Sequence, residues 1–177
     1  FKAKVTPLLD SAPEKNSVEF DALIEQNSIP ALIREFTRNA AVDGDGCLYT
    51  YWDADAETGQ TAKGAIKTEV IENTRVFFGN PNDREVQSQP WIIIETREMV
   101  RSAKLRAKAN GIGTWRNIAA DSENKATDSA KLIDDKATVL LLLWRDEDDG
   151  KIYGYEFTKN SAIRESWCLD IKLYPIS

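Results

Sequence analysis

The sequence contains no histidine, and its 177 residues include only two cysteines. Without histidine the chain lacks the commonest general base and the commonest metal ligand, so Ser-His and Cys-His nucleophile schemes are excluded within it. The two cysteines, Cys47 and Cys168, are too few for a disulfide framework. Both lie in apolar, strand-like surroundings, so we expect buried free thiols, which suits a reducing cytoplasm.

Long hydrophobic runs are missing as well. The longest, residues 139–144, is far too short to cross a bilayer, and no apolar stretch follows the first residues as a signal peptide would require. Acidic residues outnumber basic ones by 29 to 23, so the net charge is −6. We therefore do not expect the chain as a whole to attract nucleic acid, and any basic surface must be local. Because the chain starts without Met and ends at Ser177 with no capping feature, we expect a piece of a longer protein.

The residues that are present indicate a folded domain. An apolar content of 42%, with five Trp, five Tyr and six Phe, is typical of a globular chain rather than a disordered one. At this length we expect one domain over residues 1–177, which buries about 70% of the surface that its unfolded chain would expose. Residues 1–15 have two prolines and no periodicity, which predicts an extended lead-in.

Apolar spacing of three and four predicts helical structure over residues 16–42, opened by a capping box of Asn16 and Glu19. Pro30 interrupts the pattern, so we expect a kink or two short helices meeting near residues 27–29. The Asp-Gly-Asp-Gly sequence at residues 43–46 then lets the backbone take positive φ and reverse direction.

From Cys47 the apolar period becomes two. It predicts a strand that ends near Asp53, has apolar residues on both faces and is therefore covered on both. Its expected antiparallel partner is residues 66–71, with Ile66, Thr68 and Val70 facing inward. Further strands are predicted over residues 90–96, 137–145, 151–158 and 163–174. The predicted fold class is α+β: a long N-terminal helical segment packed on a mainly antiparallel β-sheet, with residues 43–177 mostly β and a further helix after the central strand.

That further helix is predicted over residues 97–110, capped by Gly111. At 100° per residue its basic side chains form one narrow stripe, whereas Met99, Val100, Ala103 and Ala107 cluster on another side. The stripe consists of Arg97, Arg101, Lys104 and Lys108. It is either a solvated face with cations favoured towards the helix C-terminus, or a contact with an acidic partner surface or a phosphate backbone. We take it as a candidate interface with a partner or a neighbouring subunit.

No motif in the sequence carries recognisable catalytic or ligand chemistry. Acidic clusters at residues 43–45, 53–57 and 146–149 lack the EF-hand spacing of glycine and glutamate. The glycines at 59 and 64 lack the Lys-Ser/Thr ending of a phosphate-binding loop, and Gly111-Ile112-Gly113 follows a helix instead of a strand. Two carboxylates can meet from anywhere in a fold, as in glycosidases, but nothing in the sequence singles out a pair. We predict no catalytic residue, no cofactor and no metal.

Several stretches in their order along the chain resemble tailed-bacteriophage portal proteins. They are the helix followed by Gly44-Asp45-Gly46, the block Tyr49-Thr50-Tyr51-Trp52-Asp53, residues 66–74 and 76–81, and the strand ending at Arg97. Residues 139–144 and the final Leu173-Tyr174-Pro175 are also similar to that family. The likeness covers about residues 16–177 and would place the chain in the wing region of a portal or prophage portal protein.

The resemblance implies a homo-oligomeric ring, typically twelve-fold, at one capsid vertex, through which DNA is packaged and ejected. The role is that of a structural conduit in the virion, made in the bacterial host cytoplasm, with no reaction catalysed by the portal itself. The implied partners are other copies of the chain, capsid, scaffold, terminase and head-tail connector proteins, and double-stranded DNA in the full-length channel, with no membrane. The stem, tunnel loop and clip of such a protein are absent from this sequence.

Two other functions stay open. One is a carboxylate-dependent hydrolase or carbohydrate-binding β domain, which a cleft holding two close carboxylates beside Trp52 or Trp115 would favour. The other is an unrelated phage head or tail adaptor.

Overall fold

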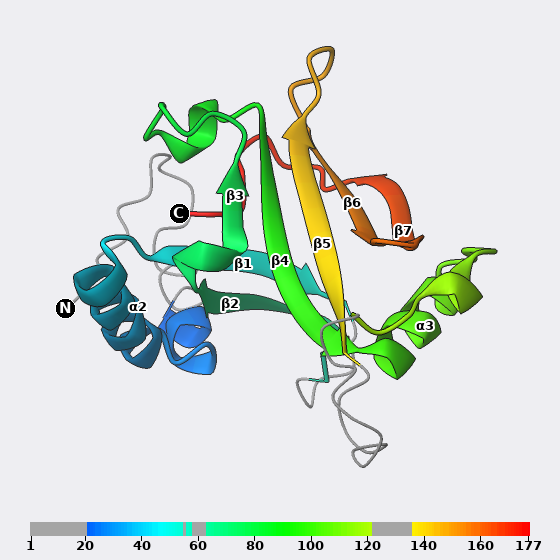
Figure 1. Cartoon of the computed structure of the whole chain (residues 1–177). Helices are drawn as coiled ribbons and strands as arrows, with labels where there is room; N and C mark the ends of the chain where they lie inside the picture. Colours follow the sequence, from blue (N-terminus) through cyan, green and yellow to red (C-terminus); the bar gives the residue numbers. More distant parts are fainter. Residues whose placement is uncertain (1–20, 55, 58–62, 122–135) are drawn as a thin grey trace. The chain divides into compact units, whose positions relative to one another are not determined.

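The computed structural model describes residues 21–54, 56–57, 63–121 and 136–177, and it shows an α+β architecture (Figure 1). Its contacts divide the chain into two compact units, the first made of Phe1–Asn73 with Pro175–Ser177 and the second of Thr74–Tyr174. The first unit contains a two-stranded sheet and the second a five-stranded sheet. The single-domain arrangement stays a prediction, and the lead-in and the capping box lie outside the described residues.

The helical part of the first unit is broken where the proline predicts it. Residues 21–26 are helical, a two-residue turn follows, and α2 (Ile29–Asp43) begins after Ser28, whose φ of 50° is left-handed. Pro30 lies in the first turn of α2, where its missing N–H costs no helical hydrogen bond. The predicted break is confirmed. Residues 16–20 are not among the described residues, so the structure does not show a long N-terminal helix.

Glycine ends α2 and lets the chain reverse. Gly44 has φ 89°, and its N–H donates to the carbonyl of Ala40 at 3.0 Å. A Cβ on Gly46 would lie 2.8 Å from the ring of Phe36, so the turn needs glycine to pass this close to the helix. β1 (Cys47–Asp53) then pairs antiparallel with β2 (Ala65–Ile71), which confirms the predicted hairpin.

Both edges of this hairpin are hydrogen-bonded. The side-chain amide of Asn27 donates to the carbonyl of Ile66, and its oxygen accepts the N–H of Thr68, each at 3.0 Å. On the other edge, residues 175–177 pair with β1, where the N–H of Leu48 donates to the carbonyl of Ser177 at 2.8 Å. An isolated two-stranded hairpin is marginally stable in water, so these two edge contacts stabilise it.

The expectation that other parts of the protein cover both faces of this hairpin is wrong where β1 ends and β2 begins. Trp52 is 62% exposed, and Ile66, directly opposite it in register and predicted to face inward, is 38% exposed. A period of two shows which residues share a face, but it does not show which face another element covers.

The second unit is a five-stranded antiparallel sheet in the order β3-β4-β5-β6-β7 (Figure 1). The strands predicted over residues 90–96, 137–145 and 151–158 are confirmed, whereas β3 was not predicted as a strand. The last strand is shorter than predicted and ends at Cys168, two residues before the left-handed Asp170 (φ 56°). The strands are β3 (Val76–Phe78), β4 (Trp91–Met99), β5 (Lys136–Arg145), β6 (Ile152–Thr158) and β7 (Ser161–Cys168). Short 3-10 turns are η1 (Asn73–Arg75), which starts at the last residue of the first unit, and η2 (Val86–Ser88) and η3 (Trp115–Asn117) in the second.

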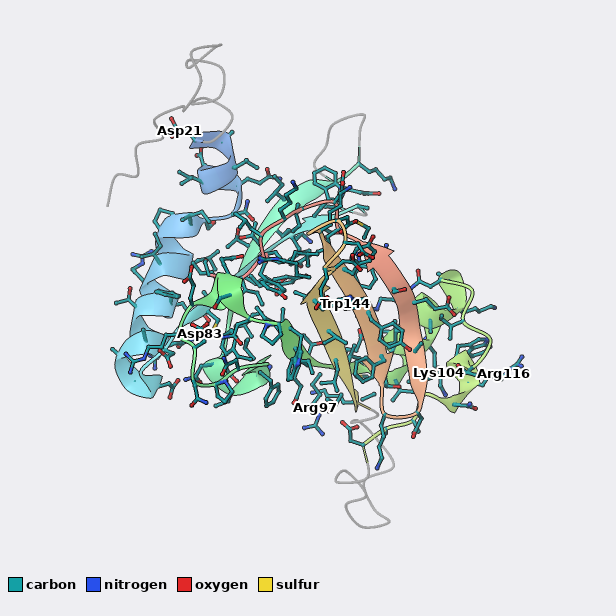
Figure 2. The ribbon with its side chains drawn as sticks, turned by 90° about the horizontal axis from the view of Figure 1, so that it is seen from above. Asp21, Asp83, Arg97, Lys104, Arg116 and Trp144 are labelled. Carbon is teal, nitrogen blue, oxygen red and sulfur yellow. The ribbon has the colours of Figure 1, made fainter. Side chains whose placement is uncertain are left out.

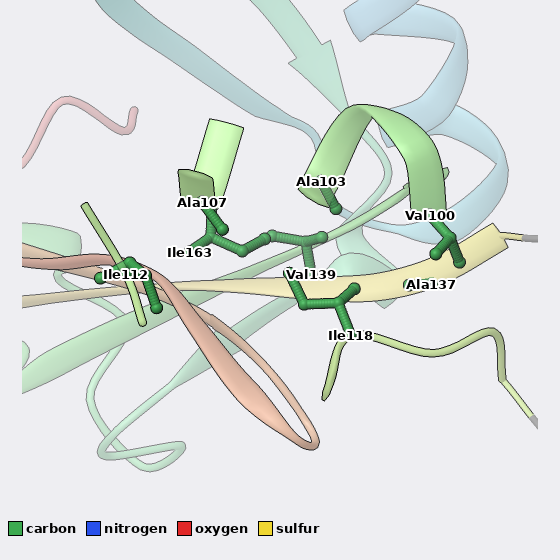
Figure 3. Packing of buried hydrophobic residues seen from close by; sticks show 8 residues of the cluster. All are labelled: Val100, Ala103, Ala107, Ile112, Ile118, Ala137, Val139 and Ile163. Carbon is green, nitrogen blue, oxygen red and sulfur yellow. The ribbon is translucent and has the colours of Figure 1, made fainter. Parts of the chain in front are cut away.

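One helix, α3 (Val100–Ala109), packs against one end of this sheet. Ala103 and Ala107 are completely buried, and Val100 is nearly so (Figure 3). They meet Ile163 from β7 and Ala137 and Val139 from β5 in one apolar cluster. The helix ends in a Schellman motif at Gly111 (φ 78°), where the N–H of Ile112 donates to the carbonyl of Ala107 at 3.0 Å.

The start of this helix differs from the prediction. Residues 97–99 belong to β4, which stays paired with β5 as far as Met99 opposite Lys136. Arg97 is therefore a strand residue, and Met99 is 49% exposed instead of buried with Val100. The helical period could be continued backwards through these residues, but hydrogen bonds to β5 hold them in the extended conformation.

The two cysteines have different surroundings. Cys47 is 6% exposed, as expected of a buried thiol, and burial raises its pKa above the ordinary value. Cys168 is exposed, so the prediction of a buried thiol is wrong there. It is the last residue of β7, which lies at the edge of the sheet.

Replacing Ile163 by alanine should test the packing of α3 on the sheet. Ile163 is fully buried in the apolar cluster, so Ile163→Ala should lower the free energy of unfolding by about 2–5 kcal/mol. Ile171→Ala is the matched control, because Ile171 is 39% exposed and its loss should change stability by no more than about 0.5 kcal/mol. Urea unfolding followed by tryptophan fluorescence measures both, and equal losses would contradict the described core.

Candidate functional site

The outward side of α3 and the turn η3 that follows it carry a group of cations, which we call the basic face. It consists of Arg101, Lys104, Lys108 and Arg116. Arg101, Lys108 and Arg116 are exposed and Lys104 is half-buried. Within the described residues, none of the four forms an ion pair. Leu105, 60% exposed, lies among them on the helix and adds an apolar contact point. An uncompensated basic surface with an apolar residue among its cations is suited to bind an anionic partner.

Trp115 contacts two cations of the basic face through its ring. The Lys108 ammonium lies 5.9 Å from the centroid of its ring, and the Arg116 guanidinium lies 4.8 Å from it. Such cation–π contacts hold long side chains in place without neutralising them. Figure 2 shows Lys104 and Arg116 on the same side of the second unit. The helical period does not predict Arg116, because this residue follows the helix, although a Trp-Arg pair soon after a helix-ending glycine is a usable signal.

Arg106 is the cation of α3 that is not part of the basic face. Its guanidinium is hydrogen-bonded to Glu98 on β4, at 3.0 Å, and to Glu156 on β6. Both carboxylates belong to the sheet against which α3 packs. One arginine therefore joins the helix to two strands, and its charge is compensated there.

Arg97 lies apart from the basic face, as the view from above in Figure 2 shows. It is on β4, and its Nε lies 3.9 Å from Oδ2 of Asp121. Three of the four predicted interface residues thus share one surface, and Arg97 does not. Whether Arg97 takes part in an interface stays a prediction.

Arg97 instead lines an open depression of about 450 Å³ in the second unit. Two carboxylates border it, Glu95 and Asp121, together with the cations Arg97 and Lys159. Asp121 already accepts hydrogen bonds from the backbone N–H and the hydroxyl of Thr138, at 2.9 and 2.8 Å. Its carboxylate therefore has a structural partner. Trp115, which belongs to the same unit, does not border this depression.

The sequence was also compared with known proteins. No family model matches it, and no curated protein matches it. The function is therefore inferred from the residues and their arrangement.

The residues that the structure describes contain neither a metal-binding cluster nor a membrane-spanning helix. No group of three or more cysteine or carboxylate side chains is placed to hold a metal ion there. In the same residues no helix is both long and apolar enough to span a membrane.

A cluster of polar and aromatic side chains lies on one face of the β1–β2 hairpin. The rings of Tyr49 and Tyr51 stack with their centroids 5.0 Å apart, and the Tyr51 hydroxyl donates to the carboxylate of Glu69. Lys67 is paired with Asp53 on the same hairpin. Partial burial, followed by the hydrogen bond to Glu69 and its negative charge, raises the pKa of Tyr51 well above the ordinary tyrosine value. The cluster holds the two strands together and keeps Tyr51 neutral.

The raised pKa of Tyr51 leads to a prediction for alkaline solution. In the unfolded chain the Tyr51 hydroxyl should ionise near pH 10, and in the folded chain it ionises at a higher pH. Above about pH 10 the folded state therefore binds more protons than the unfolded state, so the free energy of unfolding should fall as pH rises. In an absorbance titration at 295 nm, the difference between the wild type and Tyr51→Phe should show one tyrosine that ionises above the ordinary range. Glu69→Gln should move that ionisation to lower pH. A Tyr51 that titrates at or below pH 10 in the folded protein would contradict the described hydrogen bond.

Proposed function

We propose that this chain is part of the wing region of a tailed-bacteriophage portal ring. The observation that carries the proposal is the segment from α2 through Gly44 to the aromatic strand β1, whose residues resemble those of portal proteins. In the structure α2 ends at Asp43, Gly44 reverses the chain, and β1 begins at Cys47. Helix, glycine turn and aromatic strand thus follow one another in the order that the resemblance implies, which supports the proposal.

In this proposal the chain has a structural role and catalyses no reaction. The full-length protein forms a ring, typically of twelve copies, at the capsid vertex, and DNA passes through it during packaging and ejection. Its other partners are capsid, scaffold, terminase and head-tail connector proteins.

The basic face supports an assembly role. Three of its four cations are exposed on an acidic chain, and Arg106 and the apolar cluster hold α3, which carries the other members besides Arg116, against the sheet. A rigid surface loses little conformational entropy when a partner binds. We assign this face to contacts with acidic groups of a neighbouring subunit or a capsid protein.

One observation favours the carbohydrate-binding alternative. Trp52 is 62% exposed, and a flat exposed indole is a suitable surface for a sugar ring. Trp115, the other tryptophan considered for such a site, belongs to the same unit as the depression with two carboxylates and does not border it. For this reason the structural role is preferred.

Electron microscopy of the full-length protein tests the proposal. We expect rings with a central channel, whereas a monodisperse protein without rings would refute a portal function. Loss of oligosaccharide binding in a Trp52→Ala variant would instead support the alternative.

Reversing two charges on the basic face should weaken ring assembly. Lys104→Glu combined with Lys108→Glu, in the full-length protein, should reduce the fraction of rings, because like charges then face the acidic partner. Arg34→Glu with Arg38→Glu is the matched control, since these are exposed arginines with the same spacing on α2. Ring counts at ordinary salt measure the effect, and unchanged assembly in the first variant would contradict the assignment of this face.

A further inference from the structure

The second unit has an acidic surface as well as a basic one. The β5–β6 turn carries four consecutive carboxylates, which we call the acidic turn: Asp146, Glu147, Asp148 and Asp149. Glu147 and Asp148 are exposed and, in the described part of the chain, form no ion pair. The two cations that flank the turn have other partners: the Arg145 guanidinium donates to the carbonyl of Lys172 at 3.3 Å, and Lys151 is bonded to Asp170 at 2.6 Å. The turn therefore keeps its negative charge.

The acidic turn is held in one conformation. Oδ1 of Asp146 accepts the N–H groups of Asp148 and Asp149, at 2.9 and 3.3 Å. The carboxylate of Asp149 accepts the N–H of Lys151 and the hydroxyl of Tyr153, at 2.8 and 3.2 Å. Gly150 closes the turn with φ 67°. Glu147 and Asp148 are thus presented from an ordered loop, as the basic face is from an ordered helix.

These two charged surfaces lie at opposite ends of the same sheet. α3 packs where β5 begins, at Ala137 and Val139, and the acidic turn follows the last residue of β5 (Figure 1). β5 has ten residues, so its ends are roughly 30 Å apart. A lysine side chain cannot cover that distance, so the basic face of one copy cannot reach the acidic turn of the same copy.

We infer that the basic face of one copy binds the acidic turn of a second copy of this chain. Two different, complementary surfaces on one unit favour head-to-tail contact, because each copy then offers one surface to each neighbour. Such a contact closes into a ring when the rotation between copies divides a full turn. The inference rests on the proposed function for its assumption that copies associate, and it names the surfaces that do so.

Nucleic acid is the competing occupant of the basic face. The chain carries a net charge of −6, and the acidic turn belongs to the same compact unit, so a polyanion would be repelled near that turn. A second copy brings its own acidic turn and satisfies both surfaces at once. The observations therefore favour a second copy.

A charge swap in the 177-residue chain tests the inference. The first variant combines Lys104→Glu with Lys108→Glu, and the second combines Glu147→Lys with Asp148→Lys. Sedimentation velocity at low ionic strength should show self-association weakened roughly a hundred-fold in each variant, because like charges then meet at the contact. A chain carrying all four changes, or an equimolar mixture of the two variants, should associate like the wild type.

Carbodiimide cross-linking identifies the surfaces directly. With a mixture of isotopically labelled and unlabelled wild-type chains, we expect peptides in which Lys104 or Lys108 of one copy is joined to residues 146–149 of the other. These links should disappear at about 1 M salt, where the Debye length is about 3 Å.

Three outcomes would overturn the inference. The variant with all four changes could associate no better than either double variant, or the wild-type chain could stay monomeric and form none of these links. A short DNA duplex could also bind the basic face without changing self-association. Rings of the full-length protein without these links would leave the portal proposal standing and remove this contact. If these links form but the full-length protein makes no rings, the contact between copies stands and the portal proposal is refuted.

Discussion

The pairing of β4 with β5 is the constraint on which the rest of the second unit depends. The register runs from Trp91 opposite Trp144 to Met99 opposite Lys136. Because side chains alternate between faces, this register buries Ile92, Ile94, Val139 and Leu143. It also decides where the strand ends, so that α3 begins at Val100 and leaves Arg97 in the sheet. A shift of one residue would turn every apolar side chain of a strand to the other face.

Small side chains at the buried face of α3 determine what the helix can display. Ala103 and Ala107 are fully buried, so the helix backbone lies close to β5 and β7. Long side chains on this inner face would hold the helix away from the sheet. The long side chains of α3 lie instead where they can be solvated or paired. Arg106 binds two carboxylates of the sheet. The cations of the basic face form no ion pair within the described residues.

Electrostatics links this architecture to the proposed assembly. The basic face and the acidic turn are held by ordered elements at the two ends of one sheet, so the fold fixes the distance between them. Exposed charge pairs contribute little to the stability of a monomer. Between copies the same charges increase the rate of encounter and select orientation, with an effect that salt screens. A chain with a net negative charge can therefore still present a basic contact surface in one place.

The sequence by itself determined the elements whose signals are local. Pro30, Gly44 and Gly111 have local conformational effects, so the helix break, the chain reversal and the helix end could all be predicted. The alternating apolar residues predicted the hairpin and the strands of the larger sheet. Most of the basic face could also be predicted, because Arg101, Lys104 and Lys108 are placed by the helical period alone.

Tertiary structure decided what depends on distant partners. The assignment of Arg97 to a strand follows from pairing with β5, about forty residues later in the chain. The exposure of Trp52, Ile66 and Cys168 depends on which faces and edges other elements cover, which no local pattern specifies. Arg116 joins the basic face because Trp115 packs against the apolar cluster beside α3. The physical reason is the same in each case: local propensities differ by about 1 kcal/mol or less, and burial and strand pairing between distant residues outweigh them.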